Sequence, residues 1–200
     1  NSEPVSYAAA DEYLSGNVRT KLIIAQAAAK DDPELAVNVE ALKQVIPKDL
    51  SAAEISVRLG TTWIPQEDIQ QFVMELLTPS QYARGKIKVR YTEFNGDWFI
   101  ENKSSDFDNV KANSTYGTKR ASAYRIIEDT LNLRDVRIFD YVYDEHGNKK
   151  AVFNAKETTA AQSKQEAIKQ VFADWIWNDP ERRNRLVRYY HDTFNCIRPR

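Results

Sequence analysis

Hydrophobic residues in the first third of the chain recur at helical spacing. The pattern predicts a helix that Ser15 caps and that continues to about Lys30. Asp32 as a cap and Pro33 at the first helical position predict a second helix, which ends near Val45 because a proline follows soon after. The apolar positions of the first helix are Val18, Leu22, Ala25 and Ala29.

The pattern changes twice between residues 55 and 77. Apolar and polar residues alternate over 55–59, which is typical of a strand, and Gly60 interrupts the alternation. Pro65 then begins a helix with apolar residues at i, i+3, i+4, i+7 and i+8. This stripe consists of Ile69, Phe72, Val73, Leu76 and Leu77. We therefore expect a short strand followed by an amphipathic helix.

The middle of the chain carries two predicted hairpins. In the first, residues 87–102 alternate on either side of Asn95 and Gly96, which supply the positive φ values of a type I′ turn. In the second, residues 135–155 fold about a turn that contains Gly147. These are the β elements that the sequence predicts with the clearest turn signals.

Helices are predicted between the hairpins and after them. The inserted helix covers residues 119–131, with Thr118 as its cap. Residues 158–177 form the next helix, and Asp179 and Pro180 cap and begin the last one. The broad apolar face of the helix over 158–177 consists of Ala161, Ile168, Val171, Phe172, Trp175 and Ile176.

This order of elements predicts an α+β fold rather than a regular βαβ alternation. We expect helical N- and C-terminal parts packed around a small antiparallel sheet, which two β-hairpins with an inserted helix would build. Residues 1–200 would form a single domain, because this length is enough to bury a core. Its sub-division would be helical over 1–80, hairpins plus helix over 81–155, and a helical extension over 156–200.

The amino-acid composition argues against disulfides, a Cys/His zinc site and a membrane-spanning helix. One cysteine permits no internal disulfide, and with two histidines the chain has too few side chains for a Cys/His zinc site, so we expect no metal. No apolar run approaches the roughly 20 residues of a membrane-spanning helix. We expect an intracellular, cytoplasmic location and no membrane contact. The net charge of −1 does not indicate a polyanionic partner by itself, so the local distribution of charge has to be considered.

Motifs for catalysis and cofactor binding are missing from the sequence. It has no GxxxxGK[ST] phosphate loop, and its six glycines are spread singly, so we predict no cofactor site. His191 and Cys196 are five residues apart on a helix, which does not indicate mutual activation. Asp106 and Asp108 have the chemistry of paired carboxylates, although the Ser/Asp/Asn composition of a polar loop explains them better. We predict no catalytic residue.

Two groups of cations are the candidate site. Lys119 and Arg120 fall in the first turn of the predicted helix, where a bound phosphate would offset the helix dipole; alternatively they contact water, or pair with Glu128 or Asp129. The last helix interleaves arginines with aromatic residues, which suits nucleic acid but also suits an ordinary amphipathic helix. The predicted nucleic-acid-binding residues are Lys119, Arg120, Arg125, Arg182, Arg183, Arg185 and Arg188.

Five stretches together carry a family resemblance. They are ADEYLSGNVRTKL, VNVEALKQVIPKDL, ISVRLGTTWIP, STYGTKRASAYRIIEDTLNLRDVRIFD and NAKETTAAQSKQEAIKQVFADWIWNDPERRNRLVRYYHDTFNCIRPR. Together they resemble the segment between the DNA adenine methyltransferase module and the Swi/Snf-like superfamily-two helicase module of very large proteins from bacterial conjugative elements and phages. In that family helicase motifs follow shortly after the stretch ending in RPR. We therefore expect this chain to be a segment of a longer protein.

The resemblance implies a DNA context. Related fusions protect incoming mobile DNA against host restriction or process it. The parent would be an ATP-dependent helicase fused to a methyltransferase, using ATP with magnesium and S-adenosylmethionine, and no catalytic residue of either module has a counterpart here. The leading hypothesis is a non-catalytic, DNA-contacting coupler domain whose partners are DNA and the two flanking modules.

Two alternatives remain open. The first is a structural linker that packs on the helicase through an exposed apolar patch, around Trp63 or Trp175, and does not touch DNA. The second is a hydrolase that uses Asp106 or Asp108, which would require a deep pocket with converging titratable groups.

Overall fold

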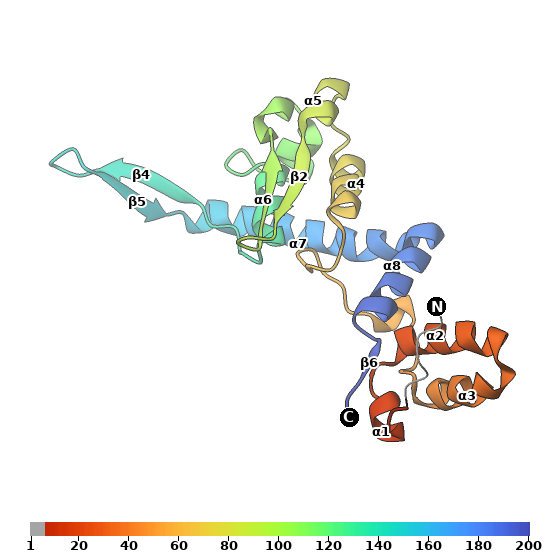
Figure 1. Ribbon diagram of the computed structural model, residues 1–200. Coiled ribbons are helices and arrows are strands. Elements are labelled where there is room, and N and C mark those ends of the chain that lie inside the picture. Colours follow the sequence, from red (N-terminus) through yellow and green to blue (C-terminus); the bar gives the residue numbers. More distant parts are fainter. Residues whose placement is uncertain (1–6) are drawn as a thin grey trace. The chain divides into compact units, whose positions relative to one another are not determined.

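The computed structural model describes residues 7–200 (Figure 1). The chain folds into two compact units. The terminal unit takes in the described residues up to Ser56 together with Pro180–Arg200, and the central unit is Val57–Asp179. These boundaries differ from the sub-division at residues 80 and 155 that the sequence indicated. Helices combine with three antiparallel two-stranded sheets, so the predicted α+β class is confirmed.

The terminal unit is mostly helical. Its helices are α1 (Ala10–Tyr13), α2 (Val18–Asp31), α3 (Ala36–Val45) and α8 (Pro180–Thr193), with 3-10 turns at Pro33–Leu35 and Ala52–Glu54. Its short strands β1 (Gly16–Asn17) and β6 (Ile197–Arg198) pair in antiparallel fashion. The cap of α2 is Asn17 rather than Ser15, because the Asn17 side chain accepts a hydrogen bond from the Thr20 amide at 3.0 Å.

The core of this unit lies between α2 and α3. Val18, Ala25, Val39 and Leu42 are its buried residues. Arg19 contacts both of the chain segments that make up this unit. It donates to the backbone carbonyl of Asn195 in the C-terminal segment, and in the N-terminal segment it donates to the Pro47 carbonyl and pairs with Asp49 at 2.5 Å. The hydrogen bond from Arg19 holds the pKa of Asp49 below its usual value.

The central unit contains the remaining elements. Its helices are α4 (Gln66–Leu77), α5 (Gln81–Lys86), α6 (Ala123–Leu131) and α7 (Ala155–Asn178), with a 3-10 turn at Lys103–Asp106 and a π-helical turn at Lys111–Thr115. Its strands are β2 (Lys88–Thr92), β3 (Asp97–Glu101), β4 (Phe139–Tyr143) and β5 (Lys149–Phe153). The apolar stripe of α4 is buried at all five predicted positions, so that helix is confirmed.

The strand predicted over residues 55–59 is wrong. These residues form no strand, although Ile55 and Leu59 are both buried. The alternation correctly indicated burial, but a strand also requires a hydrogen-bonded partner, which this segment lacks. Within the central unit, Phe72 of α4 packs against Phe172 and Trp175 of α7, with ring centroids 5.1 and 5.3 Å apart.

The hairpin β2–β3 packs between α4 and α6. Val89, Trp98 and Ile100 are buried on its inner face. Its strands are joined by a four-residue loop in which Gly96 has φ of 71° but Asn95 does not have a positive φ. The predicted two-residue type I′ turn is therefore wrong, because that turn requires both residues in the left-handed region.

The hairpin β4–β5 forms a sheet of its own instead of joining β2–β3. All residues of β5 are exposed, and the ribbon extends away from α6 and the rest of its unit (Figure 1). The segment before it runs along α7, where Gln165 accepts from the Val136 amide and Thr158 accepts from the Ile138 amide. The predicted single small sheet is thus replaced by two separate hairpins, only one of which has a buried face.

Candidate nucleic-acid interface

Lys119 and Arg120 lie in a turn before α6 and not in its first turn. Helix α6 begins at Ala123, and its cap is Ser122, whose hydroxyl accepts from the Arg125 amide. Thr118, the predicted cap, instead accepts from the amides of Arg120 and Ala121 within the turn. The prediction that these two cations lie in the first turn of the helix is therefore wrong, because both belong to the loop before it.

Gly117 explains the tight course of this loop. A Cβ atom at that position would lie 2.0 Å from the Ala112 carbonyl oxygen and 2.8 Å from the Ala123 nitrogen. Only glycine allows backbone segments to approach this closely. The loop is consequently held against both the π-helical turn and the start of α6.

Arg120 connects this loop to the base of the β4–β5 ribbon. It pairs with Asp140 at 2.7 Å and donates to the Phe139 carbonyl at 2.9 Å. Asp140 also accepts from the Asn154 amide at 2.8 Å. The hydrogen bond from Arg120, and next that from Asn154, hold the pKa of Asp140 below its usual value. The partner of Arg120 is thus Asp140 and not Glu128 or Asp129.

Arg125 brings a third segment to the same surface. It donates to the carbonyls of Arg120 and Arg137, and its Nε lies 4.0 Å from an Asp129 carboxylate oxygen. Burial raises the pKa of Asp129, and the charge of Arg125 acts in the opposite direction. Arg137 is exposed, with its guanidinium 5.3 Å from the ring centroid of Phe139.

We call these four residues the basic cluster: Lys119, Arg120, Arg125 and Arg137. Three of them were predicted from the sequence, and the structure brings those three together. Arg137 was missed as a binding residue, although it falls within the hairpin that was predicted over residues 135–155. Among the described residues, Lys119 and Arg137 have no ion pair with a carboxylate, so the cluster presents uncompensated positive charge.

The arginines of α8 belong to the terminal unit and form a separate group. Arg185 and Arg188 are exposed, and Arg188 Nε lies 3.8 Å from Asp192. Arg183 is half-buried, and Arg182 is only 6% exposed. A phosphate contact requires a surface side chain, so Arg182 is the least suited of the seven predicted residues.

The carboxylates proposed for hydrolysis are not brought together. Asp106 is buried and accepts hydrogen bonds from Tyr124, Asn109 and the Ser80 amide. Burial, together with the neighbouring Asp106, raises the pKa of Tyr124 well above its usual value. Asp108 is exposed. Asp106 therefore anchors a buried hydrogen-bond network inside the central unit.

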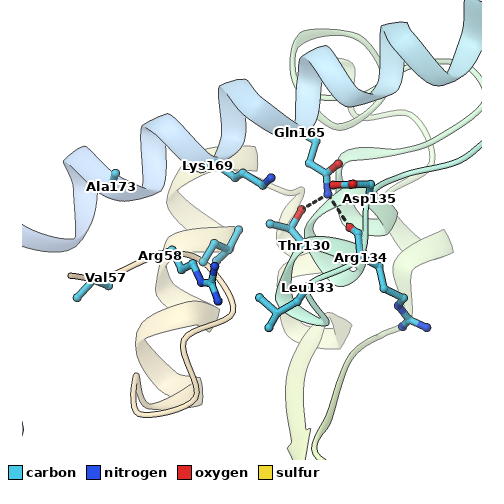
Figure 2. Close-up of a pocket in the computed structure, with 10 residues that line it drawn as sticks. Val57, Arg58, Thr130, Leu133, Arg134, Asp135, Gln165, Lys169 and Ala173 are labelled. Atoms are coloured by element: carbon cyan, nitrogen blue, oxygen red, sulfur yellow. Dashed lines mark hydrogen bonds between the residues drawn. The ribbon is translucent and has the colours of Figure 1, made fainter.

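A cavity of about 230 Å³ lies between α7, the end of α6 and the segment around Arg58 (Figure 2). Gln165 is one of its lining residues, and its side-chain amide donates to the Thr130 hydroxyl and the Arg134 carbonyl. Its lining mixes apolar side chains with Arg58, Arg134, Asp135 and Lys169. Among these lining residues of the described chain, no nucleophile is paired with a general base.

The remaining titratable candidates lie in the terminal unit. His191 is buried, with Nδ1 2.9 Å from the Asn195 amide nitrogen and Nε2 2.9 Å from the Leu50 carbonyl oxygen. Cys196 is buried, and its Sγ lies 3.5 Å from the Thr193 carbonyl. Over residues 7–200, no three His, Cys, Asp or Glu side chains are grouped as metal ligands would be.

Comparison with known protein families gives a match over most of the chain. The family described as "Domain of unknown function (DUF8437)" matches residues 58–196. The chain belongs to this family. The DUF8437 match takes in nearly all of the central unit, including the basic cluster and the β4–β5 ribbon, and continues through α8. No curated protein and no solved structure matches the chain. In the part of this DUF8437 member that the structure describes, no helix combines the length and apolar character needed to cross a bilayer.

Proposed function

We propose that this chain is a non-catalytic domain that contacts the DNA backbone and couples the modules on either side of it. The observation that supports the proposal is the basic cluster, in which three chain segments that carry cations are held next to one another at the protein surface. Arg120 and Arg125 fix the geometry of that surface through backbone carbonyls of Phe139, Arg120 and Arg137. Lys119 and Arg137 are exposed on it.

Such a surface suits phosphates. Lysine and arginine side chains at exposed positions neutralise backbone charge, and the release of condensed counterions drives the association. The net charge of −1 means that the attraction is local, because the chain as a whole would not attract a polyanion. Arg185 and Arg188 of α8 are also exposed and would give the terminal unit phosphate contacts of its own.

The biological setting comes from the family resemblance in the sequence. The flanking modules would be the DNA adenine methyltransferase and the superfamily-two helicase of a mobile-element protein in the cytoplasm. ATP with magnesium and S-adenosylmethionine would be bound by those modules and not by this chain. The coupler would keep the two enzymes at a fixed spacing on the DNA that they process or protect from restriction.

Fluorescence anisotropy with a labelled 20-base-pair duplex tests the DNA contact. The double variant Lys119→Gln, Arg137→Gln should bind about tenfold more weakly at low salt, and the slope of log K against log salt should fall by about 2. The matched control is Arg84→Gln, Lys88→Gln, which removes two exposed cations from α5 and β2 of the same unit. Absence of salt-dependent binding by the unmodified chain, or an equal loss in the control, would overturn the proposal.

The structural-linker alternative gains no support from the positions first considered for it. Trp175 is only 8% exposed and donates to Glu75 at 2.6 Å, and Trp63 is half-buried. The linker hypothesis predicts that neutralising the basic cluster leaves DNA binding by the parent protein unchanged. The same variants therefore separate the two functions.

A further inference from the structure

The β4–β5 ribbon has two chemically different faces. Paired residues of an antiparallel ribbon point to the same side, and successive residues alternate between sides. The register pairs Phe139 with Phe153, Tyr141 with Ala151 and Tyr143 with Lys149. These six residues form one side, which we call the aromatic face. The opposite face consists of Asp140, Val142, Lys150 and Val152.

The aromatic face is open to solvent. Tyr143 is 71% exposed, Tyr141 60% and Phe153 47%. Phe139 and Phe153 pack edge to face, with ring centroids 5.7 Å apart, so the rings are held in fixed positions at the base of the ribbon. Several exposed aromatic rings on one face of a projecting element mark a binding surface rather than scattered surface residues.

Cations accompany these rings. Lys149 Nζ lies 4.0 Å from the ring centroid of Tyr141, and the Arg137 guanidinium lies 5.3 and 5.5 Å from those of Phe139 and Phe153. The strand carboxylate, Asp140, is on the opposite face and is bonded to Arg120 and Asn154. The aromatic face thus combines planar apolar surface with positive charge.

The partner that matches this combination is a polyanion with exposed planar rings. Aromatic side chains interleaved with cations bind unpaired bases by stacking, while the cations contact the phosphates between them. A paired duplex keeps its bases inside and offers mainly phosphates to such a face. An apolar protein surface would leave the charges of Arg137 and Lys149 without partners.

We propose that the aromatic face of the β4–β5 ribbon binds unpaired bases of single-stranded nucleic acid. Tyr141 and Tyr143 are the stacking residues, and the backbone is contacted by Lys149 and by Arg137, the member of the basic cluster that lies against this face. This inference rests on the proposed DNA contact and names the form of nucleic acid that the ribbon selects.

The test compares single-stranded and duplex oligonucleotides of equal length on the 200-residue chain. The variant Tyr141→Ala, Tyr143→Ala keeps every charge, and Val142→Ala, Val152→Ala on the opposite face is the matched control. We expect the tyrosine variant to bind labelled oligo-dT at least tenfold more weakly, with duplex affinity changed less than twofold. A 2-aminopurine base in the oligonucleotide should change its fluorescence on binding to the unmodified chain and not to the variant. An oligo-U arm compares RNA with DNA.

The outcomes separate the two proposals. Duplex binding that depends on the basic cluster, together with unchanged oligo-dT and oligo-U affinity in the tyrosine variant, overturns the ribbon inference alone. Binding of neither duplex nor single strand overturns both proposals. Equal losses for single strand and duplex also contradict base stacking. Self-association by analytical ultracentrifugation that the tyrosine variant abolishes, without any effect on oligonucleotide binding, would assign the face to a second copy of the chain instead.

Discussion

The two hairpins of the central unit have the same size but opposite environments. Each consists of two five-residue antiparallel strands in full register. The inner face of β2–β3 is buried, with Val89, Trp98 and Ile100 each 3% exposed, whereas every residue of β5 is exposed. Alternation of apolar and polar residues is therefore not what decides which hairpin enters the core.

The difference lies in the polar side chains of the helices beside β2–β3. From α4, Gln66 and Gln70 accept from the amides of Tyr91 and Val89. On the other edge, Glu128 of α6 and the C-cap residue Asn132 accept from the amides of Ile100 and Trp98. A hairpin enters a protein interior only when its edge amides find acceptors, because an unpaired buried amide is costly.

The spacing of these acceptors follows from the geometry of the two elements. Four residues of a helix rise about 6 Å, and two residues of a strand advance about 6.8 Å, so side chains at i and i+4 match alternate edge amides. Both helices provide this spacing, α4 from residue 66 to 70 and α6 from residue 128 to its C-cap at 132. The ribbon β4–β5 projects beyond such helices, and its aromatic face stays available for a ligand.

The largest expected difference between the hairpins is in core packing. Ile100→Ala should lower the free energy of unfolding of the central unit by about 2–5 kcal/mol, because it leaves a cavity at a buried position. Val152→Ala, in the ribbon, removes two methyl groups at a position that is 42% exposed and should change it by less than about 0.5 kcal/mol. Urea denaturation followed by circular dichroism measures both. Equal effects would contradict the contrast between the hairpins.

Removal of a side chain that accepts a hydrogen bond from an edge amide of β2 should have the next largest effect on the free energy of unfolding. Gln70 accepts from the Val89 amide at 2.6 Å and donates to the Ile87 carbonyl at 2.9 Å. Gln70→Ala leaves both groups unpaired and should lower the free energy of unfolding by about 1–3 kcal/mol. Its neighbour Gln71 is exposed and bonds only to Glu75 among the described residues, so Gln71→Ala is the control.

Hydrogen exchange locates that effect. In Gln70→Ala, the Val89 amide should exchange faster, while the Ile100 amide on the opposite edge keeps its Glu128 acceptor and should be affected less. A variant that loses stability uniformly, with no preference for the β2 edge, would indicate that Gln70 acts through packing and not through the amide it caps.

Most of the helices could be predicted from the sequence, since their signals are local. The apolar stripe of α4 and the Pro180 start of α8 depend on residues within one or two turns, and both lie where expected. The secondary-structure predictions that were wrong concern segments whose structure depends on contacts with other parts of the chain. Residues 55–59 alternate but have no neighbouring strand, and Ser122 replaces Thr118 as a cap because Gly117 places the Thr118 loop against Ala112 and Ala123.

The candidate site was predictable only in part for the same reason. Lys119, Arg120 and Arg125 are close in sequence, so their proximity follows from the chain. Arg137 joins them through the hydrogen bond from Arg125 to its carbonyl, and Arg120 reaches Asp140, twenty residues away. Composition could not indicate that pairing. Nor could it indicate that Arg182 would be buried while Arg185 and Arg188 in the same helix are exposed.

The smallest expected effect concerns the base of the exposed ribbon. Since Arg120 lowers the pKa of Asp140, the stabilisation from this ion pair is present above the ordinary pKa of an aspartate and is lost as the pH falls through the lowered value. Arg120→Gln should raise the pKa of Asp140 toward its ordinary value and leave global stability nearly unchanged, because the pair is exposed. A carbon-13 NMR titration of the Asp140 carboxyl measures the shift, with Lys88→Gln as the control. An unshifted pKa in Arg120→Gln would mean that the hydrogen bond from Asn154 alone keeps the pKa of Asp140 low. The ion pair between Arg120 and Asp140 would then not connect the basic cluster to the base of the ribbon.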